Sequence, residues 1–184
     1  NLTPTNSDFL FQCELENSTA GALYSAPRYF ATPTPGAANG SGSADLGPII
    51  TRAGCVPALP LQPAVTDTIT VTASVQPAFA QVSTVTLNWR VMFNALNQIQ
   101  MLDDGLHGDG AAGDGVYGAI IPSGVATAGQ MIRWFITASD VTDHTSRWPL
   151  FNTATDSAEY LGTVFKNPSI ESLLPVLHTF IQNQ

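Results

Sequence analysis

Three segments in the middle of the chain alternate apolar and polar residues with a period of two, and this pattern constrains the fold most. They cover residues 67–74, 82–93 and 131–139. Such alternation is typical of a β-strand that buries one face and exposes the other. In the longest segment, the residues predicted to face inward are Val85, Leu87, Trp89, Val91 and Phe93. Burying a row of this kind contributes roughly 1.5–3 kcal/mol per large side chain, before the entropy cost.

Shorter apolar segments between turn-forming residues predict further strands. They cover residues 99–102, 117–122 and 157–165. None of these segments has the spacing of an amphipathic helix, and short strands separated by turns are typical of an all-β chain. We therefore predict an antiparallel β-sandwich of the immunoglobulin or fibronectin III type, with Trp89 and Trp134 in its core.

Proline and glycine interrupt the pattern before the sandwich. Residues 1–30 hold enough apolar residues for one or two strands. Residues 31–43 are dense in Pro and Gly, which disfavour both helix and sheet, so we expect either a linker or a turn-rich segment that covers a neighbouring surface. A second group of prolines predicts that residues 46–65 are extended and irregular. We expect Tyr29, Phe30 and the Pro-rich segment to pack against the side of the sandwich.

Residues 170–184 are predicted to form a final strand. Their apolar residues could fit a helix, but Pro175 lies in the middle, and an interior proline costs a helix about 3 kcal/mol. Such a strand would have no partner after it, so it could pair with a second copy and form a dimer. We predict three parts: an N-terminal extension over 1–45, a sandwich over 46–150 and a connector over 151–184.

The chain is acidic, with a formal net charge of −8 over 184 residues. Nucleic-acid binding requires clustered Lys and Arg, but the basic residues are scattered along the sequence, which excludes that class of partner. The basic residues are Arg28, Arg52, Arg90, Arg133, Arg147 and Lys166. No segment approaches the roughly 20 apolar residues of a membrane-spanning helix. Because the first residue is Asn1 rather than Met, we expect a processed chain or a segment of a longer one.

Cys13 and Cys55 are the only cysteines. In a secreted protein, an even pair could form a disulfide. The alternative is two free thiols that are buried separately, and the sequence does not decide between them.

Residues 103–118 form an acidic, glycine-rich segment without Lys or Arg. Its carboxylates belong to Asp103, Asp104, Asp109 and Asp114. They could converge on calcium, which takes six to eight oxygen ligands, although the spacing does not fit an EF-hand. The alternative is turn chemistry, because each of the three Asp-Gly pairs favours a tight turn in which Gly supplies positive φ. We expect either a calcium-binding loop or a long strand connection held by its own side chains.

No catalytic motif emerges from the sequence. His107, His144 and His178 lack the spacing of a zinc site, and the crowded carboxylates lie on a loop rather than in a predicted sugar-binding cleft. We therefore predict that the chain is not an enzyme. Tyr117 and Trp148 are the candidate ligand-binding residues, because exposed aromatic rings near the acidic loop could stack on sugars.

Three pieces of the sequence resemble parts of a known kind of protein. The stretches MLDDGLHGDGAAGDGVYGAIIP and IRWFITASDVTDHTSRWP resemble a small immunoglobulin-like module of bacterial surface and secreted proteins. The stretch YFATPTPGAAN is similar to the end of a lamin-tail-like domain, and SAEYLGTVFKNPSIESLLPVLHTFI is similar to the lead-in to a CotH kinase-like domain. Together the pieces resemble multi-domain bacterial CotH-family proteins over roughly residues 24–184.

This resemblance implies a secreted or cell-surface location in a bacterium. The kinase-like chemistry of that family would lie beyond Gln184, so no catalytic residue carries over to this chain. We predict a non-catalytic module that spaces or docks the neighbouring domains of its own polypeptide. The alternative is a carbohydrate- or surface-binding module that uses the loop from Asp103 to Asp114, with or without calcium.

Overall fold

The computed structural model describes eight stretches of the chain. They are residues 10–12, 15–18, 21–24, 28–30, 45–59, 62–149, 160–171 and 176–181. The first four stretches are short strands, described by their backbone: β1 (Leu10–Gln12), β2 (Leu15–Ser18), β3 (Gly21–Tyr24) and β4 (Arg28–Phe30). β1 pairs with β4 and β2 pairs with β3, both antiparallel. The N-terminal region therefore holds more strands than the one or two that the sequence predicts.

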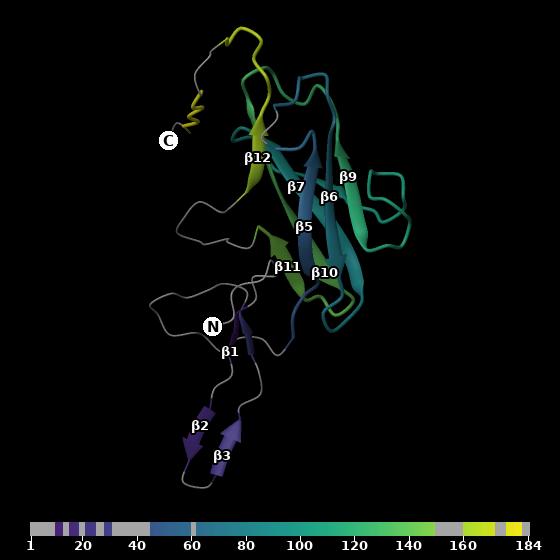
Figure 1. Cartoon of the computed structure of the whole chain (residues 1–184), viewed down its shortest axis with the longest axis vertical. Coiled ribbons are helices and arrows are strands. Elements are labelled where there is room, and N and C mark those ends of the chain that lie inside the picture. Colours follow the sequence, from purple (N-terminus) through teal and green to yellow (C-terminus); the bar gives the residue numbers. More distant parts are fainter. Residues whose placement is uncertain are drawn as a thin grey trace.

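Two antiparallel sheets face each other in the rest of the described chain (Figure 1). The first has the order β5-β6-β9, made of β5 (Ile49–Val56), β6 (Ile69–Gln76) and β9 (Val116–Ile121). The second has the order β11-β10-β7-β8, and β12 also pairs with β10. Its strands are β7 (Val82–Val91), β8 (Asn97–Gln100), β10 (Met131–Asp140), β11 (Thr145–Trp148) and β12 (Leu161–Val164). This arrangement confirms the predicted all-β sandwich.

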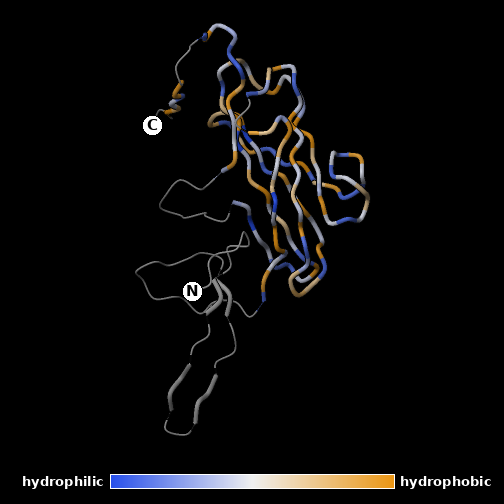
Figure 2. Tube along the Cα trace, viewed as in Figure 1, coloured by the Kyte–Doolittle hydropathy of each residue, from blue (hydrophilic) through white to orange (hydrophobic). Residues whose placement is uncertain are grey.

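The core lies between the two sheets and is built from alternate residues of each long strand. Apolar and polar residues alternate along these strands, as the hydropathy colours of Figure 2 show. The fully or almost fully buried residues include Val71 and Ala73 of β6, Val85 and Leu87 of β7, and Ile132, Trp134 and Ile136 of β10. Trp89 is buried as well, so both predicted core tryptophans are confirmed.

Phe93 does not join the inward row, contrary to the prediction. β7 ends at Val91, and Met92 adopts a positive φ of 51°. This left-handed residue breaks the alternation. The Phe93 ring lies instead 5.2 Å from the guanidinium carbon of Arg133, and Arg133 lies between the buried residues Ile132 and Trp134 of β10.

Residues 46–65 are more regular than predicted, because they contain all of β5. The prolines of this region flank the strand: Pro48 precedes it and Pro57 follows it. Within the strand, the register with β6 shifts between Thr51 and Gly54, where Arg52 has a φ of 49°. Cys55 of β5 carries a free thiol that donates to the carbonyl of Pro57, while Cys13 lies outside the described residues. The disulfide therefore stays a prediction.

The strand predicted over residues 170–184 is wrong for the part that the structure describes. Residues 170–171 and 176–181 adopt no regular strand, and Leu177 is 90% exposed. An alternating sequence forms a stable strand only when it also pairs with a neighbouring strand and packs against another surface. The described part of this segment does not pair with a strand. The last strand in the described part of the chain is β12, and it lies inside the predicted connector. The three-part division of the chain and the dimer stay predictions.

The described part of the chain contains no helix with the length and apolar character needed to cross a bilayer. The placement of Tyr29 and Phe30 side chains and of residues 31–43 lies outside the described residues.

Candidate functional site

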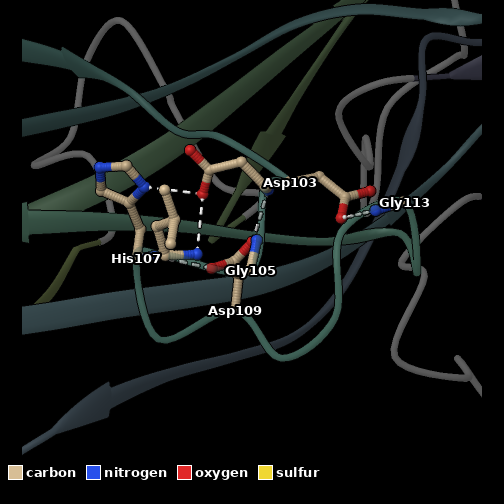
Figure 3. A network of polar contacts seen from close by, with 7 residues as sticks. Asp103, Gly105, His107, Asp109 and Gly113 are labelled. Atoms are coloured by element: carbon tan, nitrogen blue, oxygen red, sulfur yellow. Dashed lines mark hydrogen bonds and ion pairs between the residues drawn. The ribbon is translucent and has the colours of Figure 1, made fainter.

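The acidic loop that joins β8 to β9 is organised around one buried carboxylate. Asp109 is only 2% exposed, and its two oxygens accept hydrogen bonds from three backbone N–H groups (Figure 3). The donors are Asp104 and Gly105 to Oδ2 and His107 to Oδ1, each at 2.8 Å. A carboxylate satisfied in this way folds the first half of the loop into a closed turn.

The other three carboxylates also accept backbone hydrogen bonds. Asp103 accepts from Gly113 at 2.7 Å, from Asp114 at 3.2 Å and from Gly115 at 2.9 Å. Asp114 accepts from Ala111 and Val116, and Asp104 accepts from Leu106. The chain's own backbone therefore uses every acidic side chain of this loop, as the turn alternative predicts.

Glycine makes this backbone path accessible. The second residue of each Asp-Gly pair has a positive φ: 75° at Gly105, 100° at Gly110 and 82° at Gly115. The loop also folds back onto β9, because a Cβ on Gly118 would lie 2.4 Å from the carbonyl oxygen of His107. Gly118 allows this close approach, and the loop is held against the sheet.

Part of the loop could still hold a cation. One ligand atom from each of Asp104, His107 and Asp109 lies within 4.8 Å of the others. His107 Nδ1 is 2.9 Å from Asp104 Oδ1 and lowers the pKa of that carboxyl. Backbone hydrogen bonds lower the pKa of Asp109, and the bond from the N–H of Gly105 has the largest effect. Asp103 and Asp114 are not part of this group, so the four predicted calcium ligands do not converge, and calcium stays a prediction.

A second buried carboxylate repeats the pattern in the turn between β10 and β11. Asp140 is 2% exposed, and its Oδ1 accepts from the backbone and hydroxyl of Thr142 and from the backbone of His144. Burial raises the pKa of Asp140, but the hydrogen bonds from Thr142 and His144 outweigh burial and hold the pKa below its ordinary value. This His–acid pair therefore caps a turn.

Arginine and aromatic side chains meet on the outer face of the five-stranded sheet. We call this the Arg–aromatic face; its residues are Arg90, Phe93, Arg133, Phe135, Arg147 and Tyr160. Tyr160 is its centre, because the three guanidinium carbons lie 4.9–5.6 Å from the centroid of its ring. Half of the chain's basic residues are thus gathered in one place, although the sequence analysis treated them as scattered.

Two of these arginines are cross-strand neighbours. Arg90 of β7 and Arg133 of β10 are directly opposite each other in the register. Like charges in that position are destabilising. Burial, with the nearby charge of Arg90, lowers the pKa of Arg133. The Nε atoms of both side chains are buried without a hydrogen-bond partner among the described residues.

A pocket of about 390 Å³ lies beside Arg133 along β12. Its lining consists of Met131, Arg133, Tyr160, Leu161, Gly162, Thr163 and Val164. Gly162 is opposite Arg133 in the register, and a Cβ there would lie 2.6 Å from the carbonyl oxygen of Ile132. The absent side chain lets β12 approach β10 and leaves the flank of Arg133 uncovered. The described lining residues include neither a histidine nor a carboxylate.

The predicted ligand-binding aromatics lie elsewhere. Tyr117 belongs to β9 in the first sheet, and Trp148 belongs to β11 in the second. Both are half-buried and pack against the hydrophobic core, and burial raises the pKa of Tyr117. The structure does not bring them together over the acidic loop, and their binding role stays a prediction.

The Arg–aromatic face had a signal in the sequence that the sequence analysis did not use. Arg90 and Arg133 occupy outward positions in two of the alternating segments. Had these segments been paired, the two arginines would have been expected on one face.

The comparisons with known proteins bear on the sandwich. Residues 58–132 match the family model of the conditioned medium factor 2nd Ig-like domain. The match covers less than half of the chain, from the residues before β6 to the start of β10. Together with the two antiparallel sheets, it makes this part of the chain an Ig-like β-sandwich.

No curated protein matches the chain. A solved structure titled "Crystal structure of Br derivative BhCBM56" is 9% identical, with a TM-score of 0.36. That alignment covers 61% of this chain and 88% of the other.

Proposed function

We propose that the chain is a non-catalytic interaction module of a larger bacterial extracellular protein, in which it spaces and docks neighbouring domains. The Arg–aromatic face carries this proposal. Arg, Tyr and other aromatic residues are the types enriched in the buried cores of protein interfaces. An acidic chain that gathers half of its basic residues around one tyrosine has a surface suited to a partner.

The acidic loop supports the same proposal by the way its charges are used. A carboxylate that acts as a general acid or base must be free to exchange a proton with substrate. Asp109 instead accepts three backbone hydrogen bonds, and hydrogen bonding keeps its pKa low. Asp140 is bound to its turn through Oδ1, which accepts from the backbone of Thr142 and His144, while its buried Oδ2 lies 3.5 Å from His144 Nδ1. These groups stabilise the module and do not prepare it for a reaction.

The neighbours in this proposal are a lamin-tail-like domain before the chain and a CotH kinase-like domain after it, in a secreted or cell-surface polypeptide. The basis is the resemblance of residues 29–39 and 157–181 to parts of such proteins. An Ig-like sandwich with strands at both ends suits a connecting position, because its first and last strands lie on opposite sheets. The translated parent gene tests this directly: it should encode both domains around these residues.

Docking is tested by binding between separately purified parts. The chain, immobilised for surface plasmon resonance, should bind at least one flanking domain of its own polypeptide. Absence of any interaction with either flanking domain would contradict docking. Turnover of a substrate by the chain alone would contradict a non-catalytic role. Binding of a polysaccharide that Tyr117→Ala and Trp148→Ala abolish would favour the alternative of a carbohydrate-binding module.

A further inference from the structure

The Arg–aromatic face contains positive charge that the described part of the chain does not neutralise. Neither Arg90 nor Arg133 forms an ion pair among the described residues, where the recorded ion pairs involve His107 and His144. Arg90 donates one hydrogen bond, at 3.3 Å, to the hydroxyl of Tyr160. Arg147 donates to the carbonyl of Pro149. A guanidinium offers five donors, so much of the donor capacity of Arg90 and Arg133 remains for a partner.

The strands around these arginines add no acidic side chain to this face at the described positions. The outward positions of β7, β10 and β11 carry hydroxyl, amide, aromatic and Arg side chains, and no Asp or Glu lies among these described positions. Next to the arginines, Gln98 donates to Asn88, and Asn88 donates to Thr137. These neutral groups satisfy one another. The groups on this face that still lack a partner are therefore guanidinium donors, and a negatively charged acceptor suits them.

The pocket beside Arg133 adds an apolar requirement. Met131, Leu161 and Val164 lie in its lining next to the Arg133 guanidinium and the Tyr160 ring. A peptide that carries a carboxylate and an apolar side chain two residues apart meets both demands, since an extended peptide presents every second residue to the same surface. A neutral sugar could accept hydrogen bonds from these arginines, but it brings no negative charge to the two guanidinium groups.

We propose that the Arg–aromatic face and the adjoining pocket bind an acidic peptide segment of a protein partner. Arg133 and Arg90 receive its carboxylates, and Met131 and Leu161 receive an apolar side chain. The proposal rests on the proposed function, because it names the kind of surface that the interaction module recognises. Binding relieves the like-charge opposition of Arg90 and Arg133 by placing carboxylates against them.

The test uses the full chain and a short fluorescein-labelled peptide in which Glu and Leu occupy every second position in turn, with Ser between them, so that both face one side of the extended peptide. Fluorescence anisotropy at low salt should show saturable binding, and a peptide with Gln in place of Glu should not bind. Arg133→Gln should weaken binding at least about tenfold, as expected for loss of a charge-assisted hydrogen bond. Arg52→Gln is the matched control, because it removes the same charge from an exposed position on β5, in the other sheet. It should leave the affinity within about twofold.

Three results would overturn this proposal. The first is equal weakening by Arg133→Gln and Arg52→Gln, which would reduce the effect to overall charge. The second is binding of polygalacturonate, but not of the peptide, in an Arg133-dependent way. The third concerns Asp156 and Glu159, which lie outside the described residues between β11 and β12: if only the Asp156→Asn, Glu159→Gln variant bound the peptide, the chain itself would occupy the face.

The same variants separate this proposal from the function on which it rests. If a flanking domain binds wild type and Arg133→Gln equally well, docking stands and the acidic-peptide site is wrong. If no flanking domain binds but the labelled peptide does so through Arg133, the site stands and docking of neighbours is wrong. Circular dichroism and the melting temperature of each variant confirm that folding is retained.

Discussion

The acidic loop and the Arg–aromatic face concentrate opposite charges on one sandwich, but they use these charges differently. In the loop, Asp103 and Asp109 each accept three backbone hydrogen bonds, and Asp109 is buried. On the face, Arg90 and Arg133 oppose each other across two strands, and their Nε atoms have no partner among the described residues. The carboxylates that accept backbone hydrogen bonds stabilise the loop, whereas the guanidinium groups without such partners are available to bind another molecule.

Substitution of Asp109 should have the largest effect on stability. Asp109→Ala leaves three inward-pointing N–H groups without their acceptor, and buried unsatisfied donors are costly. We expect the melting temperature to fall by roughly 5–15 °C. Asp114→Ala, at an exposed position, is the control and should cost less. Equal melting temperatures for wild type and Asp109→Ala would show that the loop charge is not structural.

Lowering the pH should reduce the difference in stability between wild type and variants of Asp109. Hydrogen bonds lower the pKa of Asp109 in the folded state, so its contribution to stability is present above the unfolded pKa of about 4 and is lost as the pH falls through the folded value. The gap in melting temperature between wild type and Asp109→Asn should therefore narrow below about pH 4. Thermal unfolding from pH 7 to pH 2.5 measures it, and a gap that stays constant would contradict the assignment.

Substitution of an arginine on the Arg–aromatic face should change stability little, in contrast to substitution of Asp109. Arg133→Gln removes one of two like charges that face each other, so we expect a change in unfolding free energy within about 0.5 kcal/mol of zero. Urea unfolding followed by tryptophan fluorescence measures it. A loss of several kcal/mol would mean that the Arg–aromatic face is structural, and the contrast with the loop would fail.

Chelation should have the smallest effect. Because the loop carboxylates accept backbone hydrogen bonds, we expect EDTA to change the melting temperature by less than about 2 °C. A larger fall, reversed by added calcium and abolished in Asp104→Asn, would show that Asp104, His107 and Asp109 hold a cation. The loop would then need calcium in addition to its own hydrogen bonds.

The sequence predicts those parts of the fold that depend on local alternation. In segments such as 131–139, the apolar or polar character of each residue indicates whether its side chain faces the core or the outside. The Asp-Gly turns were predictable for the same reason, because positive φ is a local property of glycine. The proline density of residues 46–65 obscures β5 in the sequence, because Pro48 and Pro57 lie just outside the strand and do not interrupt it.

Local alternation does not predict which residues come together on the Arg–aromatic face. Arg90, Arg133 and Tyr160 come from distant parts of the chain, and they meet only through the pairing of β10 with β7 and β12. Pairing depends on the register between strands, which alternation within one strand does not specify. The end of β7 shows the same limit, since one residue with positive φ, Met92, takes Phe93 out of the predicted inward row.

The most direct test of the contrast is a chemical-shift titration of the isotope-labelled chain with the Glu–Leu peptide. Amide signals of β7, β10 and β12 around Arg90, Arg133 and Gly162 should shift in a saturable way, while those of residues 103–118 stay unchanged. Shifts centred on the acidic loop, or shifts that persist unchanged in Arg133→Gln, would contradict the assignment of recognition to the Arg–aromatic face.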